Sequence, residues 1–363
     1  MANNGFSKYD LDIPSPPEWE VMDATKLKCL MSCERMFFFE YVLGWRQESS
    51  IHLSYGTHVH QALHEIALSG KSPFSLDLRD FINSYYQGVP KVTLSQIVEL
   101  YVQASQNEIL QKFWYSFPSK EYWDVNKNPV KGILSLFLFC QEPMTEWKML
   151  EGQPMVELGG QIVLSEDMVL SYRLDGFGKL PNGNWGGVEY KTGAASQNWE
   201  SQWETDLQVT LYSLVGYEAT GKLGGLAVKG LLVNKSTLDD TKGLDKKDPF
   251  RHVTNKNIVV YKNAGQLYSF IEDLKTWWER LHWNFTQASL TKQSEVLVGF
   301  PRNYKNCSSF YGRTCPYLDY CHSHHLNILK SVIKNNYQPL EFVINHWNPL
   351  EGLKTSLDVE RII

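Results

Sequence analysis

The sequence lacks the excess of basic residues that proteins coating nucleic acids usually have. It holds 35 lysines and arginines against 40 aspartates and glutamates, for a formal net charge of −5. This balance excludes binding to DNA through a broadly positive surface, but it leaves room for a protein in which one groove is basic. Residues 242–262 are a candidate groove lining, and a solvated loop of mixed charge is the alternative.

Long hydrophobic runs, repeats and phosphate-binding loops are missing as well. The longest apolar stretch, near residues 133–140, is too short to span a bilayer, and residues 1–20 lack the apolar segment of a signal peptide. We therefore expect a soluble, cytoplasmic protein that does not insert into membranes. No G-x-x-x-x-G-K-[ST] loop occurs, which excludes a helicase motor of the P-loop type. In a reducing compartment the six cysteines are better explained as metal ligands or buried thiols than as disulfides.

The order of apolar patterns predicts a mixed α/β fold. A helix is expected from Asp23 or Thr25 to about Leu43, another over residues 56–68, and largely helical structure over 94–150, broken near Pro118 and Asn128. Strands are then predicted over residues 154–164, 169–180 and 185–191, the last two joined as a hairpin. The remaining predicted elements are a helix over 203–216, strands over 226–233 and 258–261, and a helix over 264–290.

Two acids and a lysine occupy matching positions of the predicted hairpin. Glu189 and Lys191 project from the same face of one strand, and Asp175 lies on the partner strand. Mg²⁺ and Mn²⁺ prefer oxygen ligands, and such a metal activates water beside a phosphate while an ammonium steadies the developing charge. The pattern therefore indicates metal-assisted phosphodiester hydrolysis, and a surface ion pair is the alternative. The apolar residues before Glu189 favour a buried strand. Burial of charged side chains is unfavourable unless they are paired or bind a metal.

Three histidines crowd the helix predicted over residues 56–68. His60 and His64 are four residues apart, which also suits zinc, but neither H-E-x-x-H nor H-x-x-E-H is present. From the pattern alone, His60 is well explained as a partly buried histidine held by a hydrogen bond. We expect His58 and His64 to be structural or exposed.

Six short motifs, taken in order, resemble those of PD-(D/E)XK nucleases of the RecB-like and Cas4-like branch. They span roughly residues 26–325, and each is only moderately specific, but their shared order is hard to reach by chance. The motifs are the segment from Cys33 to Gly44, the segment from Gly56 to His60, Tyr172 to Gly176, Val188 to Gly193, Asp206 to Tyr212, and Phe300 onward through Cys307, Cys315 and Cys321.

The resemblance implies a role for each matching residue. His60, Asp175 and Glu189, with the backbone carbonyl of Tyr190, would bind Mg²⁺ or Mn²⁺, and Lys191 would be the catalytic lysine. In the helical motif from Asp206 to Tyr212, Gln208 and Tyr212 would contact the DNA backbone or support the site. One strand earlier, Glu157 matches a supporting acid that some relatives have.

A cysteine site is the second implication of the resemblance. The ligands of a [4Fe–4S] cluster would be Cys33, Cys307, Cys315 and Cys321. Zn²⁺ is the alternative, either at the same four thiolates or in a local Cys/His site, because His322, His324 and His325 follow closely. As the fourth ligand, Cys29 is a rival to Cys33, and Cys140 is expected in the core.

The fold class that follows is a restriction-endonuclease-like PD-(D/E)XK core, a small mixed sheet flanked by helices. A helical insertion and a C-terminal cysteine-rich iron–sulfur segment are added to it. The expected divisions are an N-terminal extension (1–24), N-terminal helices with the first cysteine and the histidine (25–70), a helical insertion (71–152), the nuclease core (153–299), the cluster segment (300–326) and a tail (327–363).

The function implied is that of an exonuclease on single-stranded DNA or DNA ends, in repair or recombination within a bacterial, archaeal or phage-infected cell. Tyr190, Trp199 and Trp203 could stack on unpaired bases. A homo-oligomer, or a helicase or recombination protein, is the expected partner besides DNA. Two alternatives are kept: a DNA-binding iron–sulfur scaffold subunit without cleavage activity, and a structure-specific endonuclease on the same fold.

Overall fold

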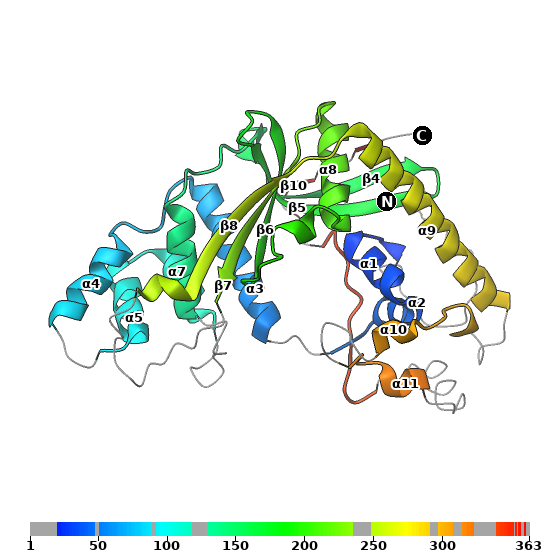
Figure 1. Ribbon diagram of the computed structural model, residues 1–363, viewed down its shortest axis with the longest axis horizontal. Helices are drawn as coiled ribbons and strands as arrows, with labels where there is room; N and C mark the ends of the chain where they lie inside the picture. Colours follow the sequence, from blue (N-terminus) through cyan, green and yellow to red (C-terminus); the bar gives the residue numbers. More distant parts are fainter. Residues whose placement is uncertain are drawn as a thin grey trace.

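A mixed seven-stranded sheet lies at the centre of the computed structural model, with helices on both faces (Figure 1). The structure describes residues 20–47, 51–88, 92–117, 129–234, 248–290, 297–307, 314–322 and 339–351, together with positions 353, 355–356 and 359–360. Helices on both faces of one sheet give each apolar face a partner. The mixed α/β class predicted from the sequence is confirmed.

The sheet grows from an antiparallel meander. Its strands are β4 (Val156–Ser165), β5 (Met168–Lys179), β6 (Trp185–Ala194), β7 (Leu226–Val233) and β8 (Val253–Val260). Neighbours β4, β5 and β6 pair antiparallel, β7 runs parallel to β6, and β8 is antiparallel to β7. The parallel pair is linked through helix α8 (Leu207–Thr220). The predicted hairpin is confirmed, and Gly183 supplies the positive φ (+82°) that its turn requires.

The first predicted helix is wrong in one respect, because it does not run unbroken to Leu43. It ends at Ser32, and Cys33 is extended before the chain turns helical again. The segments are α1 (Ala24–Ser32), α2 (Glu34–Phe37) and the π-helical turn η3 (Phe38–Val42). The apolar period continues across the break, so the sequence pattern hides it. The break directs Cys33 toward the C-terminal part of the chain, where the Asn303 N–H lies 3.4 Å from its Sγ.

Helices α3 to α7 cover one face of the sheet and form a core with it. Their bounds are α3 (Ile51–Ser69), α4 (Leu78–Gly88), α5 (Leu94–Ser105), α6 (Glu108–Tyr115) and α7 (Pro129–Cys140). Helix α3 begins earlier than predicted, and the expected stretch 94–150 has an additional break at Gln106, whose φ is +50°. Asn107 then caps α6 through its side chain. Pro118 and Asn128 lie outside the described residues.

Helices α1, α8 and α9 (Ala264–Leu290) pack on the opposite face of the sheet. The bounds of α9 match the prediction. Within the described residues, no helix combines the length and apolar character needed to cross a bilayer. The short segment η5 (Ser201–Trp203) lies between β6 and α8, and η6 (Pro249–His252) lies between β7 and β8.

The described part of the C-terminal region packs against the N-terminal segment and the central sheet. Helices α10 (Tyr304–Cys307) and α11 (Leu318–His322) precede β9 (Val343–Ile344), which pairs with β1 (Trp45–Arg46). Strands β10 (Thr355–Ser356) and β11 (Val359–Glu360) then extend the central sheet beside β4, and a small ribbon joins β2 (Met149–Leu150) to β3 (Gln153–Pro154). The ring of Phe342 stacks on those of Trp45 and Tyr317. The tail therefore joins the N-terminal segment to the sheet edge.

Candidate functional site

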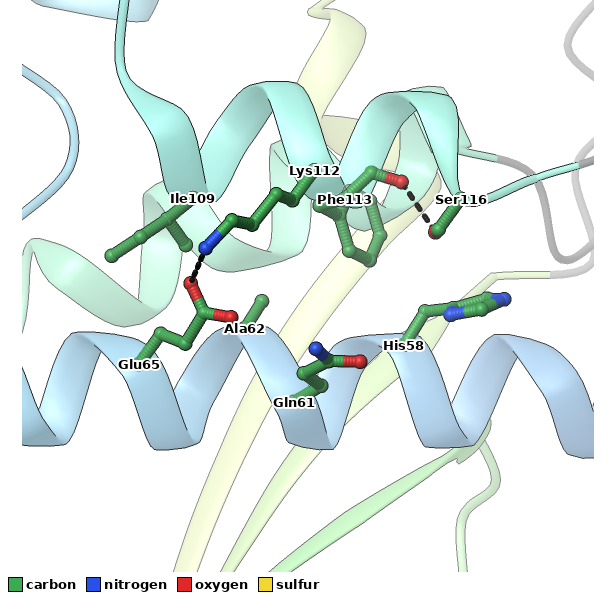
Figure 2. A pocket seen from close by; sticks show the side chains of 8 residues that line it. All are labelled: His58, Gln61, Ala62, Glu65, Ile109, Lys112, Phe113 and Ser116. Carbon is green, nitrogen blue, oxygen red and sulfur yellow. Dashed lines mark hydrogen bonds and ion pairs between the residues drawn. The ribbon is translucent and has the colours of Figure 1, made fainter.

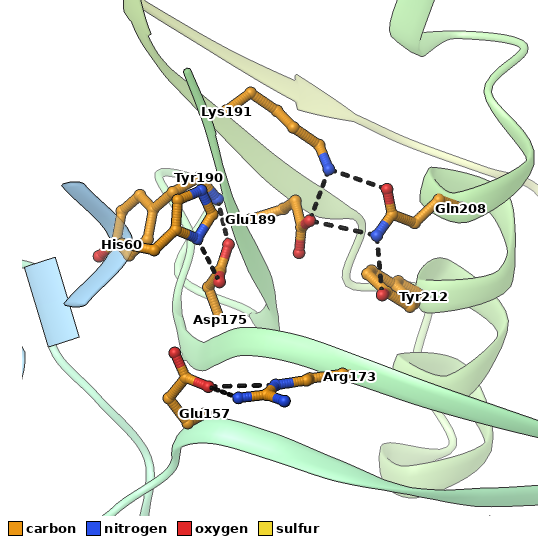
Figure 3. A network of polar contacts seen from close by, with 9 residues as sticks. All are labelled: His60, Glu157, Arg173, Asp175, Glu189, Tyr190, Lys191, Gln208 and Tyr212. Atoms are coloured by element: carbon orange, nitrogen blue, oxygen red, sulfur yellow. Dashed lines mark hydrogen bonds and ion pairs between the residues drawn. The ribbon is translucent and has the colours of Figure 1, made fainter. Parts of the chain in front are cut away.

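Strand β6 separates its side chains between two environments. Val188 and Tyr190 face the core made with α3 to α7, whereas Glu189 and Lys191 project to the other face, toward α8. The pairing of Gly176 with Val188 brings Asp175 of β5 next to this point. The alternation predicted from the sequence therefore places both acids and the lysine at one end of the β5–β6 pair (Figure 3).

Asp175 is held by two donors that come from different elements. Its Oδ1 lies 3.0 Å from Nδ1 of His60 on α3, and its Oδ2 accepts a 2.6 Å hydrogen bond from the backbone N–H of Tyr190. Gly56 marks the close approach of α3 to the sheet, since a Cβ there would come within 3.1 Å of the Thr192 hydroxyl. The histidine predicted from an early helix thus reaches the predicted acid.

Glu189 belongs to a second, contiguous network (Figure 3). Its Oε1 accepts from Lys191 Nζ at 2.7 Å and from Gln208 Nε2 at 3.3 Å. Gln208 also accepts from Lys191 at 2.8 Å and lies 2.9 Å from the hydroxyl of Tyr212, one turn along α8. The Tyr212 side chain is buried, so its place is beneath the site, where it supports Gln208.

Burial and charge act in opposite directions on these groups. Burial and the nearby Asp175, opposed by Lys191, together raise the pKa of Glu189 to about 7. For Asp175, burial is outweighed by His60 and the Tyr190 N–H, so its pKa is lowered. Burial disfavours the cationic forms of His60 and Lys191, but the adjacent carboxylates raise both pKa values. Each carboxylate thus has its own cationic partner.

The residues present fit a divalent cation at one specific atom. Oε2 of Glu189 is buried and has no hydrogen-bond partner among the described residues, while Oε1 is saturated by Lys191 and Gln208. A buried carboxylate oxygen without a donor is unfavourable, and a hard cation removes that deficit. Within the described residues, no three histidine, cysteine or acidic side chains stand ready as a metal-binding group. His60 and Asp175 instead bond to each other, as do Lys191 and Glu189.

Glu157 lies on β4, level with Asp175, between the paired positions 156 and 158. Its φ is +51°, a left-handed conformation that costs a residue with a side chain on the order of 1–3 kcal/mol. The carboxylate is held by Arg173 at 2.7 Å, and the same guanidinium donates to the Glu351 carbonyl at 3.3 Å. The predicted supporting acid is thus near the site but engaged by an arginine.

Two further histidines of the predicted cluster, His58 and His64, lie on the same helix. His58 lines a small pocket of about 110 Å³ between α3 and α6, together with Gln61, Glu65 and Lys112 (Figure 2). Burial lowers its pKa. His64 is buried. Of the three histidines of the predicted cluster, His60 is the one whose ring nitrogen bonds to Asp175.

Aromatic residues near the site differ in exposure. Tyr190 and Trp199 are each only 3% exposed, so as placed they offer no ring face to an unpaired base. Tyr190 faces the α7 side because of strand alternation, and Trp199 fills the space over Gly230, where a Cβ would lie 2.3 Å from its ring. The stacking prediction is wrong for these two residues. Trp203 is partly exposed, and its ring centroid lies 5.8 Å from Lys191 Nζ.

Four cysteines line one cavity at the junction of the two chain ends. They are Cys33, Cys307, Cys315 and Cys321, the four that the resemblance implies. Burial and the other three thiols, opposed by Arg35, together raise the pKa of Cys321 to about 11. A cation bound beside such thiols would favour their ionised form. As placed, they do not form a ready metal-binding group, as noted above for the described residues.

Cys29 and Cys140 lie outside this cavity. Cys29 is buried, its thiol lies 4.0 Å from an oxygen of Glu40, and its pKa is raised well above the usual value because of burial and that carboxylate. Cys140 is half-buried beside Tyr190 at the end of α7. The geometry therefore favours Cys33 over Cys29 as a fourth member of the cysteine group.

The basic run predicted as a groove lining is described only from residue 248 onward. Lys256 pairs with Glu200 at 3.0 Å, and Lys262 donates to the backbone carbonyl of Glu204. Lys246 and Lys247 lie outside the described residues. The two described lysines therefore hold the segment after β6 in place.

A family model of the PD-(D/E)XK nuclease superfamily matches residues 22–322. Among solved structures, the chain is similar to a "Putative exonuclease" from Eubacterium rectale, at 12% sequence identity and a TM-score of 0.32, over 85% of this chain and 94% of that one. A similarity this low adds nothing to the assignment. No curated protein matches the chain. Because the family model spans well over half of the residues, the chain belongs to the PD-(D/E)XK nuclease superfamily.

Proposed function

We propose that this chain is a Mg²⁺- or Mn²⁺-dependent exonuclease that hydrolyses single-stranded DNA or DNA ends. The observation that carries the proposal is the buried carboxylate of Glu189. One of its oxygens is fixed by Lys191 and Gln208, and the other has no donor within the described residues. A buried charge left half-satisfied beside a second acid and a histidine is typical of a metal centre.

The roles assigned follow from position. Glu189, Asp175 and His60 would hold the metal, together with the backbone carbonyl of Tyr190. When bound, the metal supplies charge that polarises the scissile phosphate and lowers the pKa of a water. Lys191, fixed at 2.7 and 2.8 Å by Glu189 and Gln208, is placed to neutralise charge that develops on the phosphate or to orient the attacking water.

Family membership and a metal-competent acid cluster support a phosphodiesterase, and the DNA substrate is part of the proposal. The test compares the parent with Glu189→Ala and Lys191→Ala on end-labelled single- and double-stranded DNA with Mn²⁺. We expect both variants to lose at least 100-fold in rate, because each removes a group that acts on the transition state. Degradation at an equal rate by all three would contradict the assignment.

A closed circular single strand separates the two modes of cleavage. An exonuclease leaves the circle intact and degrades the same strand after it is linearised. Nicking of the circle would replace the exonuclease with the structure-specific endonuclease. Tight binding with no metal-dependent cleavage of either form would favour the scaffold alternative.

We further propose that the chain belongs to the RecB-like, Cas4-like branch and binds a [4Fe–4S] cluster through Cys33, Cys307, Cys315 and Cys321. The shared cavity of these four thiols supports this proposal. Such a cluster would join two segments that are far apart in sequence. Cys33 and the neighbouring Asn303 are separated by 270 residues.

The cluster is tested on protein purified without oxygen. We expect a brown sample with four irons per chain, and loss of colour together with a lower midpoint of thermal unfolding for Cys321→Ser. Cys140→Ser is the matched control, because that thiol lies outside the cavity, and it should keep both colour and iron. A colourless parent that contains zinc would replace the cluster with a Zn²⁺ site.

A further inference from the structure

We propose that Trp203 is a positioning residue that holds the ammonium of Lys191 at the reaction centre. The inference rests on the proposed nuclease function, and it assigns a role to a residue that none of the family motifs includes. Trp203 lies in η5, within the segment of residues 196–206 that joins β6 to α8.

The first observation is the contact itself. Lys191 Nζ lies 5.8 Å from the centroid of the Trp203 ring, within the reach of roughly 6 Å for a cation–π interaction. The other two partners of the ammonium are Glu189 and Gln208. Because Trp203 approaches as a ring, it takes up space beside the ammonium without adding a charge that would compete for the metal or the phosphate.

The second observation is the state of the indole nitrogen. Nε1 of Trp203 is buried and has no hydrogen-bond partner among the described residues. An unsatisfied buried N–H costs about 1–3 kcal/mol. No hydrogen bond of this N–H therefore fixes the orientation of the Trp203 ring, so the packing contacts of the ring must fix it. Besides the ammonium, those contacts include Trp199, whose ring meets that of Trp203 edge-on at 5.6 Å.

The third observation is the number of attachments that hold the segment. Asp206 pairs with Lys28 of α1 at 2.7 Å, Glu200 pairs with Lys256 of β8 at 3.0 Å, and the Glu204 carbonyl accepts from Lys262. Trp199 anchors the same segment in the core over Gly230. Exposed ion pairs are each worth little, but two of them and a lysine–carbonyl hydrogen bond on eleven residues, with a buried tryptophan, define one placement of the Trp203 ring.

The ring of Trp203 would limit the movement of Lys191 when Glu189 binds the metal. Glu189 both anchors Lys191 and, in the proposed function, gives its second oxygen to the metal. If that carboxylate shifts toward the metal, Lys191 loses its shortest contact and would be free to follow it. The ring of Trp203 and the amide of Gln208 then keep the ammonium where the phosphate arrives. Misplacing a catalytic group by about 1 Å can cost about 100-fold in rate.

The first experiment measures the contact without any nuclease assay. Unfolding of the parent, Trp203→Leu, Lys191→Met and the double variant gives a double-mutant cycle. We expect a coupling of about threefold or more in the unfolding equilibrium constant, which is the lower range for cation–π pairs. Additive effects of the two substitutions would overturn the contact.

The second experiment measures kcat and KM on single-stranded DNA with Mn²⁺. Trp203→Leu should lower kcat about tenfold to 100-fold with KM within about twofold, since positioning acts on the chemical step. Trp203→Phe should keep most of the parent kcat, because it retains an aromatic face and loses only an N–H that makes no bond. The matched control is Trp283→Leu. Trp283 is a partly exposed residue of α9 whose ring lies 4.3 Å from Arg280, and α9 carries none of the acids of the site.

The outcomes separate this inference from the nuclease assignment. A parent-like kcat in Trp203→Leu, or a higher KM with kcat unchanged, overturns positioning; the second result would make Trp203 a base-stacking residue. Either result leaves cleavage by the parent, and so the proposed function, intact. A parent that cleaves no DNA overturns both.

Discussion

Replacement of Glu189 by glutamine should stabilise the metal-free protein at pH 8. Glu189 is 4% exposed, and burial raises its pKa from 4.5 to about 7. A folded-state pKa above the unfolded value gives stability that is complete below pH 4.5 and is lost as the pH rises through 7. The rise corresponds to about 3 kcal/mol at about 1.4 kcal/mol per pKa unit. Glutamine has nearly the shape of the protonated acid and does not ionise, so it escapes this loss.

The measurement is urea unfolding in EDTA at several pH values. The advantage of Glu189→Gln over the parent should grow from about 1 kcal/mol at pH 5 to about 3 kcal/mol above pH 7, following the ionisation of the unfolded chain. Excess Mg²⁺ should stabilise the parent at pH 8 by about 2.7 kcal/mol at 100 times its Kd, and the variant by much less. DNA cleavage should be lost in the variant although its fold is the more stable.

The matched control is Glu272→Gln on α9, where the side chain is half exposed and pairs with Lys275. This substitution should follow the pH dependence of the parent. The reasoning is refuted if Glu189→Gln is less stable than the parent at pH 8, or if the difference between them is the same at pH 5 and pH 8. Either result would mean that the carboxylate is stable as an anion without a metal.

Three further perturbations probe other parts of the structure. Asp175→Asn removes the carboxylate that raises the pKa of His60 and leaves the burial that lowers it, so the imidazole should titrate below 6.5 instead of above it by NMR; an unchanged pKa would contradict the contact. Phe342→Ala should cost about 3–5 kcal/mol in urea unfolding, because it removes a buried ring, and a cost below 1 kcal/mol would mean that the C-terminal segment is not docked. Gly230→Ala should cost about 1–3 kcal/mol and perturb tryptophan fluorescence, since its Cβ would lie 2.3 Å from the Trp199 ring; a parent-like spectrum and stability would contradict that packing.

A matched control for the ring truncation is Tyr268→Ala, in which an exposed ring on α9 is removed from a surface position. Its cost should stay within about 0.5 kcal/mol, as is usual for surface substitutions.

The central strands and the acids were predictable because they depend on local rules. Alternation along β6 alone places Glu189 and Lys191 on one face, and the turn at Gly183 fixes the partner strand that holds Asp175. The contact between His60 and Asp175 spans 115 residues and came from the family resemblance rather than from any local pattern. The residue roles, the domain divisions, the cellular location and the protein partners stay predictions.

Other features depended on tertiary contacts that leave no local signal. The helical break at Cys33 falls inside an apolar pattern that continues without interruption. The break is seen only in the structure, where Cys33 is extended and approaches Asn303. Strands of two residues, such as β10 and β11, have no periodicity of their own and exist because β4 offers a free edge. Trp199 looked suited to stacking on bases, but its burial was decided by Gly230 on a neighbouring strand.

The cysteine cavity also has a consequence for how the chain acquires its structure during synthesis. Residue 33 leaves the ribosome long before residues 307 to 321, so this cavity stays open until the roughly 270 residues between them have been made. Contacts of such high sequence separation are slow to form, because the whole intervening chain must first be confined. The nascent protein can therefore pair β4 to β8 while the cysteine cavity is still open, and only later residues bring Phe342 against Trp45 and add β10 and β11 to the sheet.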